Sequence, residues 1–187
     1  MSTDVLSLKQ VMLQDTEREK PKFAPNDEYS FPGAFTIYLP HDCHIDSYPK
    51  RIRLDREVPS IFVEYLFVPE VLRHSGIATR LLGSLVAHAK SNGILLIESW
   101  NISEDATKAE AAVVGEDNLH YYDFEHSQRE LPMSLEQACD SIGLSRGRWH
   151  EYQRLHPDRD VPFDIGLCVI ANLSNVDTAS LELPVIS

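Results

Sequence analysis

The sequence is poor in cysteine and has no long apolar run. Its 187 residues include only three cysteines, Cys43, Cys139 and Cys168, at wide spacing. Disulfide frameworks of secreted proteins use even numbers of closely spaced cysteines, so we expect reduced thiols and an intracellular protein. No run approaches the roughly 20 apolar residues that span a bilayer, and the N-terminal segment has no signal-peptide core. These absences predict a soluble, cytoplasmic protein.

Basic residues are also scarce. There are 29 Asp and Glu against 17 Lys and Arg, which gives a formal net charge of -12. Proteins that coat nucleic acid are normally basic, so a nucleic-acid partner is not expected. The balance permits an amine-bearing substrate or partner, although solubility alone explains it equally well. With 43% hydrophobic residues, the chain has enough apolar side chains for the core of a single domain over residues 1–187.

The centre of the chain predicts a strand, a loop, a helix and a second strand. Residues 60–68, SIFVEYLFV, are apolar on both faces apart from Glu64, which is typical of a strand covered on both sides. Residues 78–91 predict a helix that ends at Asn92-Gly93, and residues 94–100 predict the second strand. The connection is long enough for a right-handed crossover between neighbouring parallel strands.

The flanking segments predict further helices and strands around this centre. The expected helices are residues 4–19, 104–114, 134–142 and 148–155, and the expected strands are residues 34–39, 51–55 and 163–171. Residues 115–130 are polar and predict irregular structure, and the tail, residues 181–187, is expected to lie against a sheet edge. Together these elements predict an α/β (α+β) fold with a mixed central sheet flanked by helices.

The loop between the first central strand and the helix, RHSGIATRLL, suits a phosphate group. The first turn of a helix has unpaired N–H donors, and its dipole end is positive. Gly76 lets the backbone approach a ligand, Ala78 is nearly as small, and Arg73 adds a positive charge. The Gly-Lys-Ser/Thr of a P-loop and the three glycines of a dinucleotide fingerprint are both absent. A plain strand-to-helix turn would also contain one glycine.

The wider stretch VEYLFVPEVLRHSGIATRLLGSLVAHAKSNGILLIES resembles the acyl-CoA-binding motif of the GNAT acetyltransferase superfamily. That motif is Arg or Gln, two residues, Gly, one residue, then Gly or Ala, matched here by Arg73, Gly76 and Ala78. The resemblance covers about 40 of the 187 residues. It implies a GNAT-like fold, acetyl-CoA or another acyl-CoA as co-substrate, and transfer of the acyl group to an amine-bearing small molecule or protein. Family analogy also suggests a homodimer.

The resemblance also implies which residues hold the co-substrate. Loop amides would hold the pyrophosphate, and the end of the preceding strand would pair with the pantetheine arm. An Asn after the second strand would contact CoA. The residues in question are Phe67, Val68, Arg73, His74, Ser75, Gly76, Ile77, Ala78, Thr79 and Asn101.

Catalysis would need a general base and a proton donor. Glu64 is the candidate base, because a carboxylate buried in an apolar strand tends to have a raised pKa; the alternative is a Glu paired with an Arg at the sheet surface. The family's Tyr pattern on the next helix is absent, which leaves Tyr152, and after it Tyr122, as candidate acids. A GNAT-like module with weak or no catalysis that acts through a protein partner is therefore the alternative function.

The segment HDCHID, residues 41–46, is the remaining cluster of metal-ligating side chains. It contains His41, Cys43, His44 and Asp46 within six residues. A zinc site usually draws on a second, distant pair of ligands. No metal is therefore expected.

Overall fold

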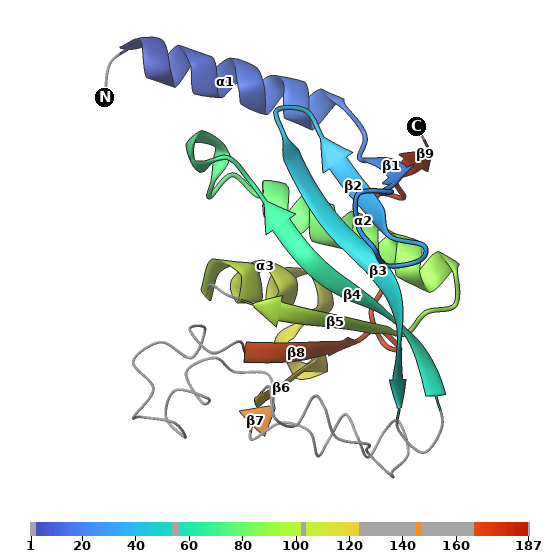
Figure 1. The fold of residues 1–187 in the computed structure, drawn as a ribbon. Coiled ribbons are helices and arrows are strands. Elements are labelled where there is room, and N and C mark those ends of the chain that lie inside the picture. Colours follow the sequence, from blue (N-terminus) through green and yellow to red (C-terminus); the bar gives the residue numbers. More distant parts are fainter. Residues whose placement is uncertain (1–2, 54–56, 102–103, 124–144, 147–166, 187) are drawn as a thin grey trace.

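The structure is a computed structural model that describes residues 3–53, 57–101, 104–123, 145–146 and 167–186 (Figure 1). The described strands form one mixed sheet in the order β7-β6-β8-β5-β4-β3-β2-β1-β9. The strands are β1 (Lys22–Pro25), β2 (Phe35–Leu39), β3 (Cys43–Arg53), β4 (Glu57–Phe67), β5 (Leu96–Asn101), β6 (Leu119–Asp123), β7 (Ser145–Arg146), β8 (Leu167–Asn172) and β9 (Val185–Ile186). The helices are α1 (Thr3–Arg18), α2 (Ile77–Ser91) and α3 (Glu104–Val114), with short 3-10 helices η1 (Glu70–Leu72) and η2 (Glu116–Asn118).

The predicted central unit is confirmed. Strand β4, helix α2 and strand β5 follow one another, and β4 and β5 are parallel neighbours in the sheet. Helix α2 ends where predicted, because Gly93 adopts φ 71 and its amide donates to the Lys90 carbonyl at 3.0 Å. The prediction of a mixed sheet flanked by helices is therefore correct.

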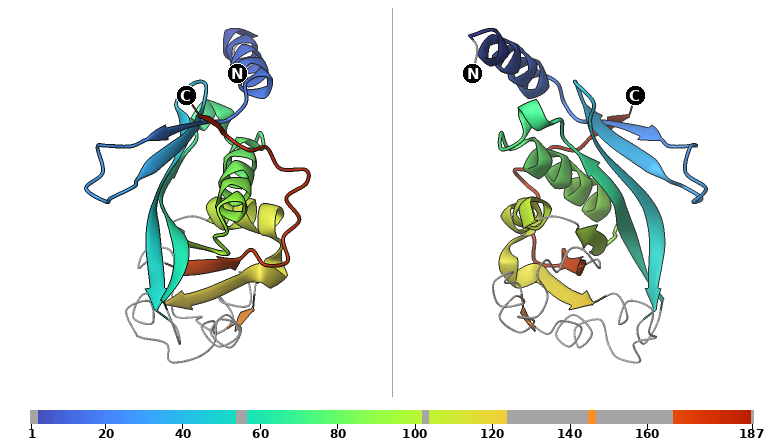
Figure 2. Two further views of the ribbon diagram at one scale, coloured as in Figure 1. Left: turned by 90° about the vertical axis from the view of Figure 1, so that its right-hand side faces the viewer. Right: turned by 60° about the vertical axis from the view of Figure 1, so that its left-hand side comes forward.

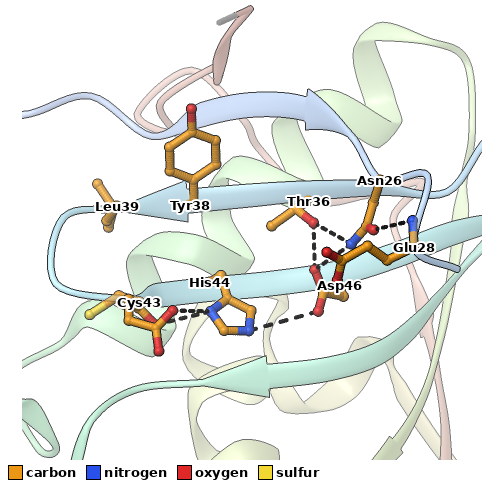
Figure 3. Close-up of a pocket in the computed structure, with 9 residues that line it drawn as sticks. Asn26, Glu28, Thr36, Tyr38, Leu39, Cys43, His44 and Asp46 are labelled. Carbon is orange, nitrogen blue, oxygen red and sulfur yellow. Dashed lines mark hydrogen bonds and ion pairs between the residues drawn. The ribbon is translucent and has the colours of Figure 1, made fainter.

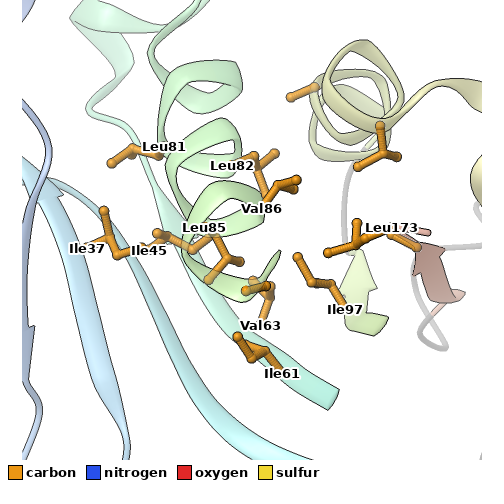
Figure 4. Packing of buried hydrophobic residues seen from close by; sticks show 14 of the residues in the cluster. Ile37, Ile45, Ile61, Val63, Leu81, Leu82, Leu85, Val86, Ile97 and Leu173 are labelled. Carbon is orange, nitrogen blue, oxygen red and sulfur yellow. The ribbon is translucent and has the colours of Figure 1, made fainter. Parts of the chain in front are cut away.

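Helices α2 and α3 lie on the same side of the strands β2 to β4 (Figure 2). The three- and four-residue spacing of apolar residues along α2 places Leu81 and Leu85 against this face, where both are fully buried. They meet Ile37 and Ile45 from β2 and β3, together with Ile61 from β4 (Figure 4). Burying a Leu or Ile side chain stabilises the fold by about 1.5–3 kcal/mol, so this layer fixes α2 on the sheet.

Several sequence predictions are wrong in detail. Residues 51–53 do not start a short strand; they end β3, which begins at Cys43. Residues 119–123, expected to be irregular, form β6 between β7 and β8, because their pairing partners come from distant parts of the chain. Strand β1, beside Pro21 and Pro25, was not predicted. Its pairing with Val185 and Ile186 of the tail confirms that the tail lies at a sheet edge. The predicted helices 134–142 and 148–155 lie outside the described residues.

None of the helices in the described ranges combines the length and the apolar character needed to cross a bilayer.

Candidate functional site

The parallel strands β4 and β5 pair over only three residues each. Residues 61–63 pair with residues 97–99, and the last pair is Val63 with Ser99. Both strands continue beyond that point, β4 to Phe67 and β5 to Asn101, and they diverge (Figure 1). The edge of β4 that faces β5 is therefore not paired with β5 over residues 64–67.

An irregularity in β4 falls at the point of divergence. Asp46 of β3 pairs with Tyr65, whereas the next residue, Ser47, pairs with Val63, so Glu64 is an extra residue in β4. A bulge of this kind breaks the alternation of side chains, and Glu64 and Tyr65 are accordingly both exposed. The prediction that Glu64 is buried is wrong for this reason, and the end of β4 is not covered on both sides.

The loop after β4 is held by short-range hydrogen bonds. The amide of Leu72 donates to the Pro69 carbonyl at 2.8 Å, and Arg73 Nε donates to the Val68 carbonyl at 3.2 Å. The hydroxyl of Ser75 donates to the Leu72 carbonyl. The Val68 carbonyl, expected to pair with a ligand, is therefore already engaged by Arg73.

The loop ends at an uncapped helix N-terminus. Gly76 is the N-cap of α2 with φ 82 and ψ 0, and no side chain caps the helix. The first bond into the helix runs from the Arg80 amide to the Gly76 carbonyl at 3.0 Å. In the described part of the chain, the amides of residues 74–79 donate to no carbonyl or side chain. A Cβ added at Gly76 would meet no atom within 4 Å, so a side chain at this position would project into open space.

The structure brings most of the predicted binding residues together. Those in the loop, Arg73, His74, Ser75 and Gly76, are exposed, and Ala78 and Thr79 are half-buried in the first turn of α2. Ile77 is buried in the core and offers only its backbone. Phe67 and Val68 lead into the same loop. The side chains of Asn101 and Tyr122 and the whole of Tyr152 lie outside the described part of the chain.

The other face of the strands β2 to β4 carries aromatic and acidic side chains. A depression of about 360 Å³ lies on this face beside Tyr65, over β2 and β3 (Figure 3). Among the described residues, its lining contains three carboxylates and no Lys or Arg. The lining residues are Asn26, Glu28, Thr36, Tyr38, Leu39, Asp42, Cys43, His44 and Asp46.

The carboxylate of Asp46 in this depression accepts hydrogen bonds from three side chains. One of its oxygens accepts from Thr36 Oγ1 at 2.5 Å and from Asn26 Nδ2 at 3.2 Å, and the other accepts from the Tyr29 hydroxyl at 3.2 Å. His44 Nε2 lies 3.7 Å from Asp46 Oδ2. Burial, and then the negative charge of Asp46, raise the pKa of Tyr29 to about 12, with a smaller contribution from Glu64. Tyr29 therefore remains a hydrogen-bond donor at neutral pH.

Tyr48 lies on the same face, one residue pair from the bulge. Its ring stacks on Phe31 with centroids 4.0 Å apart, and its cross-strand partner is Phe62. Burial raises the pKa of Tyr48, and the charges of Glu64 and Glu98 raise it further. Among the described residues, no hydrogen-bond partner of its hydroxyl is present. Because its pKa is raised, this phenol is protonated at neutral pH, and it lies within the field of Glu64.

Sequence patterns indicated some residues of this face, such as His44 and Asp46 as potential metal ligands, but not how the face is assembled. Asp46 and Tyr48 come from β3 and Glu98 comes from β5, and nothing in the sequence reports that these two strands flank β4. The one available signal was the alternation of polar residues in HDCHIDSY, which a β-strand places on one face.

Neither metal ligands nor known relatives indicate a function. In the ranges that the structure describes, no three His, Cys, Asp or Glu side chains are placed so that they could hold a metal ion. Cys43 is a buried free thiol, and burial raises its pKa to about 11, so it is a poor ligand and nucleophile. The chain matches no protein-family model and no curated protein.

Proposed function

We propose that the chain is a GNAT-like N-acyltransferase that binds acetyl-CoA, or another acyl-CoA, between the diverging ends of β4 and β5. One observation carries this proposal. The parallel strands part at Val63 and Ser99, and the longer of them, β4, is followed by a nine-residue loop that ends at a helix N-terminus, where the amides of residues 74–79 have no hydrogen-bond partner among the described residues. An unpaired strand edge and an anion site follow each other along a short stretch of chain.

These two features match the two chemically different parts of CoA. The pyrophosphate is an anion, and the amides of residues 74–79 with the positive end of the α2 dipole would hold it. The pantetheine arm contains amide groups, which would pair with the free edge of β4 over residues 64–67 as an added strand does. The thioester at the end of the arm would then lie close to Glu64.

Glu64 suits the role of general base because of its position. The attacking amine must be neutral, and in the reaction its nitrogen bonds to the thioester carbon while the carbon–sulfur bond breaks. The proton of the amine would pass to Glu64, directly or through one water. The Tyr48 hydroxyl would donate a hydrogen bond to the departing thiolate, and its raised pKa suits this better than full proton transfer.

The acceptor would approach over the face that carries the depression. Glu28, Asp42, Asp46 and Glu64 give this face negative charge, and exposed Tyr65 supplies an aromatic surface. Carboxylates and aromatic rings both attract cations, so a positively charged amine is the acceptor class that this surface favours.

Calorimetric titration with acetyl-CoA tests the first half of the proposal. The wild type is expected to bind, and Gly76→Glu is expected to abolish binding, because it places a bulky anion where the pyrophosphate should lie. Gly93→Glu is a matched control at the other end of α2. Gly93 also has a left-handed backbone, φ 71, and open space around an added Cβ. If wild type and Gly76→Glu behave alike, the loop is only a turn.

A module that binds acyl-CoA without transferring the acyl group is the second candidate. The exposure of Glu64 favours it, because an exposed carboxylate lacks the apolar surroundings expected of a tuned base. Acetyl-CoA consumption in the presence of a panel of amines separates the two candidates. Binding without consumption for any amine would support the module.

A further inference from the structure

The side chain of Arg80, on the first turn of α2, joins three parts of the chain. Its Nη1 donates to the Thr16 carbonyl at 2.5 Å, and its Nη2 donates to the Glu19 carbonyl at 2.6 Å. The same Nη2 lies 2.8 Å from Glu182 Oε2. Two of these partners lie at the end of α1, and the third lies in the C-terminal tail. The Arg80 side chain is 23% exposed and that of Glu182 is 44% exposed, so this cluster lies at the surface and is partly open to water.

The backbone of Arg80 belongs to the anion site itself. Its amide donates to the carbonyl of Gly76, the N-cap residue, at 3.0 Å. One residue therefore connects the loop amides with α1 and with the tail. Arg80 belongs to the stretch RHSGIATRLL, but its contacts are with partners 61 to 102 residues away, which no local pattern reports.

The C-terminal tail runs along α2 from one end to the other (Figure 2). Lys90 Nζ donates to the Val176 carbonyl at 2.6 Å near the end of the helix. In the middle, Leu181 lies so close to Gly83 that an added Cβ would meet its Cδ2 at 3.3 Å. Near the start, Glu182 meets Arg80, and the Val185 amide donates to the Pro21 carbonyl at 2.8 Å.

We infer that Arg80 is a positioning residue of the acyl-CoA site, and that binding of acyl-CoA is coupled through it to docking of the C-terminal tail. The inference rests on the proposed function. Arg80 holds the first turn of α2 in place through α1 and residues 182–186, and so fixes the direction of the amides that meet the pyrophosphate. Because coupling between two binding events is reciprocal, ligand binding must also tighten the tail.

A purely electrostatic role of Arg80 makes the opposite prediction at Glu182. If Arg80 attracted the pyrophosphate only by its charge, removal of the neighbouring carboxylate would strengthen the positive field. Glu182→Ala would then bind acetyl-CoA more tightly. If Arg80 acts by position, Glu182→Ala removes one of its three anchors and weakens binding. The sign of the change therefore identifies the mechanism.

The experiment uses the full chain and acetyl-CoA as the probe. Calorimetry is expected to show about tenfold weaker binding for Arg80→Gln and a smaller loss for Glu182→Ala. Lys90→Gln is the matched control, since it removes a contact between α2 and the tail at the end of the helix away from the loop. It should lower the melting temperature without changing the affinity. If Arg80 had a merely structural role, Arg80→Gln would show this same pattern.

Hydrogen exchange on the wild type tests the coupling without any variant. Saturation with acetyl-CoA is expected to slow exchange of the amides of residues 181–186, and Arg80→Gln is expected to remove that protection. Unchanged exchange in the tail, or Arg80→Gln and Glu182→Ala that bind like the wild type, would overturn the inference while the proposed function stands. A folded wild type that does not bind acetyl-CoA would overturn both.

Discussion

Lys50 and Glu98 form an ion pair across the strand that separates them. Lys50 Nζ lies 2.8 Å from Glu98 Oε2, although β3 and β5 flank β4 on opposite sides. The pair passes over Phe62 of β4, whose ring centroid is 5.0 Å from Lys50 Nζ. Glu98 is 3% exposed and pairs in register with Phe62, one residue before β4 and β5 part. The contact ties three strands together next to their divergence.

Loss of this ion pair should destabilise the fold. Lys50→Met removes a charge-assisted hydrogen bond from the buried carboxylate of Glu98, and we expect the free energy of unfolding to fall by about 1–3 kcal/mol. Urea denaturation measures the change. Arg51→Met is the control from the neighbouring position, where both partners of the Arg51–Glu57 ion pair are exposed and the expected loss is below about 1 kcal/mol. Equal losses for the two variants would contradict the prediction.

Replacement of Glu64 should separate catalysis from binding. Glu64→Gln keeps the size of the side chain but cannot accept a proton, so we expect turnover of acetyl-CoA with an active amine to fall by about 10²-fold or more. The affinity for acetyl-CoA should stay the same, because the amides of residues 74–79 are untouched. Glu57→Gln, at the exposed start of the same strand, is the control and should leave turnover unchanged. Full activity in Glu64→Gln would exclude this residue as the base.

The sequence predicted the parts of the fold that local patterns determine. Helix α2 has apolar residues at helical spacing and a Gly stop, and both are visible without any partner. Strand β6 was missed because its residues, LHYYD, become a strand only through pairing with β8, which lies about 50 residues away. Strand β1 was missed because Pro21 and Pro25 favour a turn as readily as a strand, and its pairing with the distant tail leaves no local pattern.

Only part of the candidate site could likewise be predicted from local patterns. The loop residues from Arg73 to Gly76 follow one another, so a motif could identify them. The exposure of Glu64 could not be predicted, because it results from a bulge that appears only when β4 is set against β3. The anchors of Arg80 and the ion pair between Lys50 and Glu98 likewise depend on which strands and segments become neighbours.

The packing of α2 against the sheet should be the main source of stability in this region. Leu85 is fully buried among Ile and Leu side chains of the core, and Leu85→Ala should lower the free energy of unfolding by about 2–5 kcal/mol. Leu8 of α1 is 56% exposed, and Leu8→Ala should change the free energy of unfolding by less than about 0.5 kcal/mol. Thermal or urea denaturation followed by circular dichroism checks both values. A small loss at Leu85 would contradict the placement of α2.

His88 should make the protein sensitive to mild acid. Its imidazole is half-buried, with ring centroids 4.8 Å from Phe23 and 5.3 Å from Phe35, and burial lowers its pKa. The unfolded chain, where a His has a pKa of about 6.5, therefore binds a proton more readily than the folded protein. Stability should be full above about pH 6.5 and should fall as the pH drops below that value.

Replacement of His88 tests this direction of the pH dependence of stability. His88→Phe removes the titrating group and keeps an aromatic ring in contact with Phe23 and Phe35, so the free energy of unfolding should depend less on pH between pH 5 and 7. His74→Gln, which removes an exposed imidazole, should keep the wild-type dependence. Denaturation curves at a series of pH values supply the comparison. If His88→Phe loses stability in acid as steeply as the wild type, the sensitivity arises from other groups, and burial of His88 contributes nothing to it.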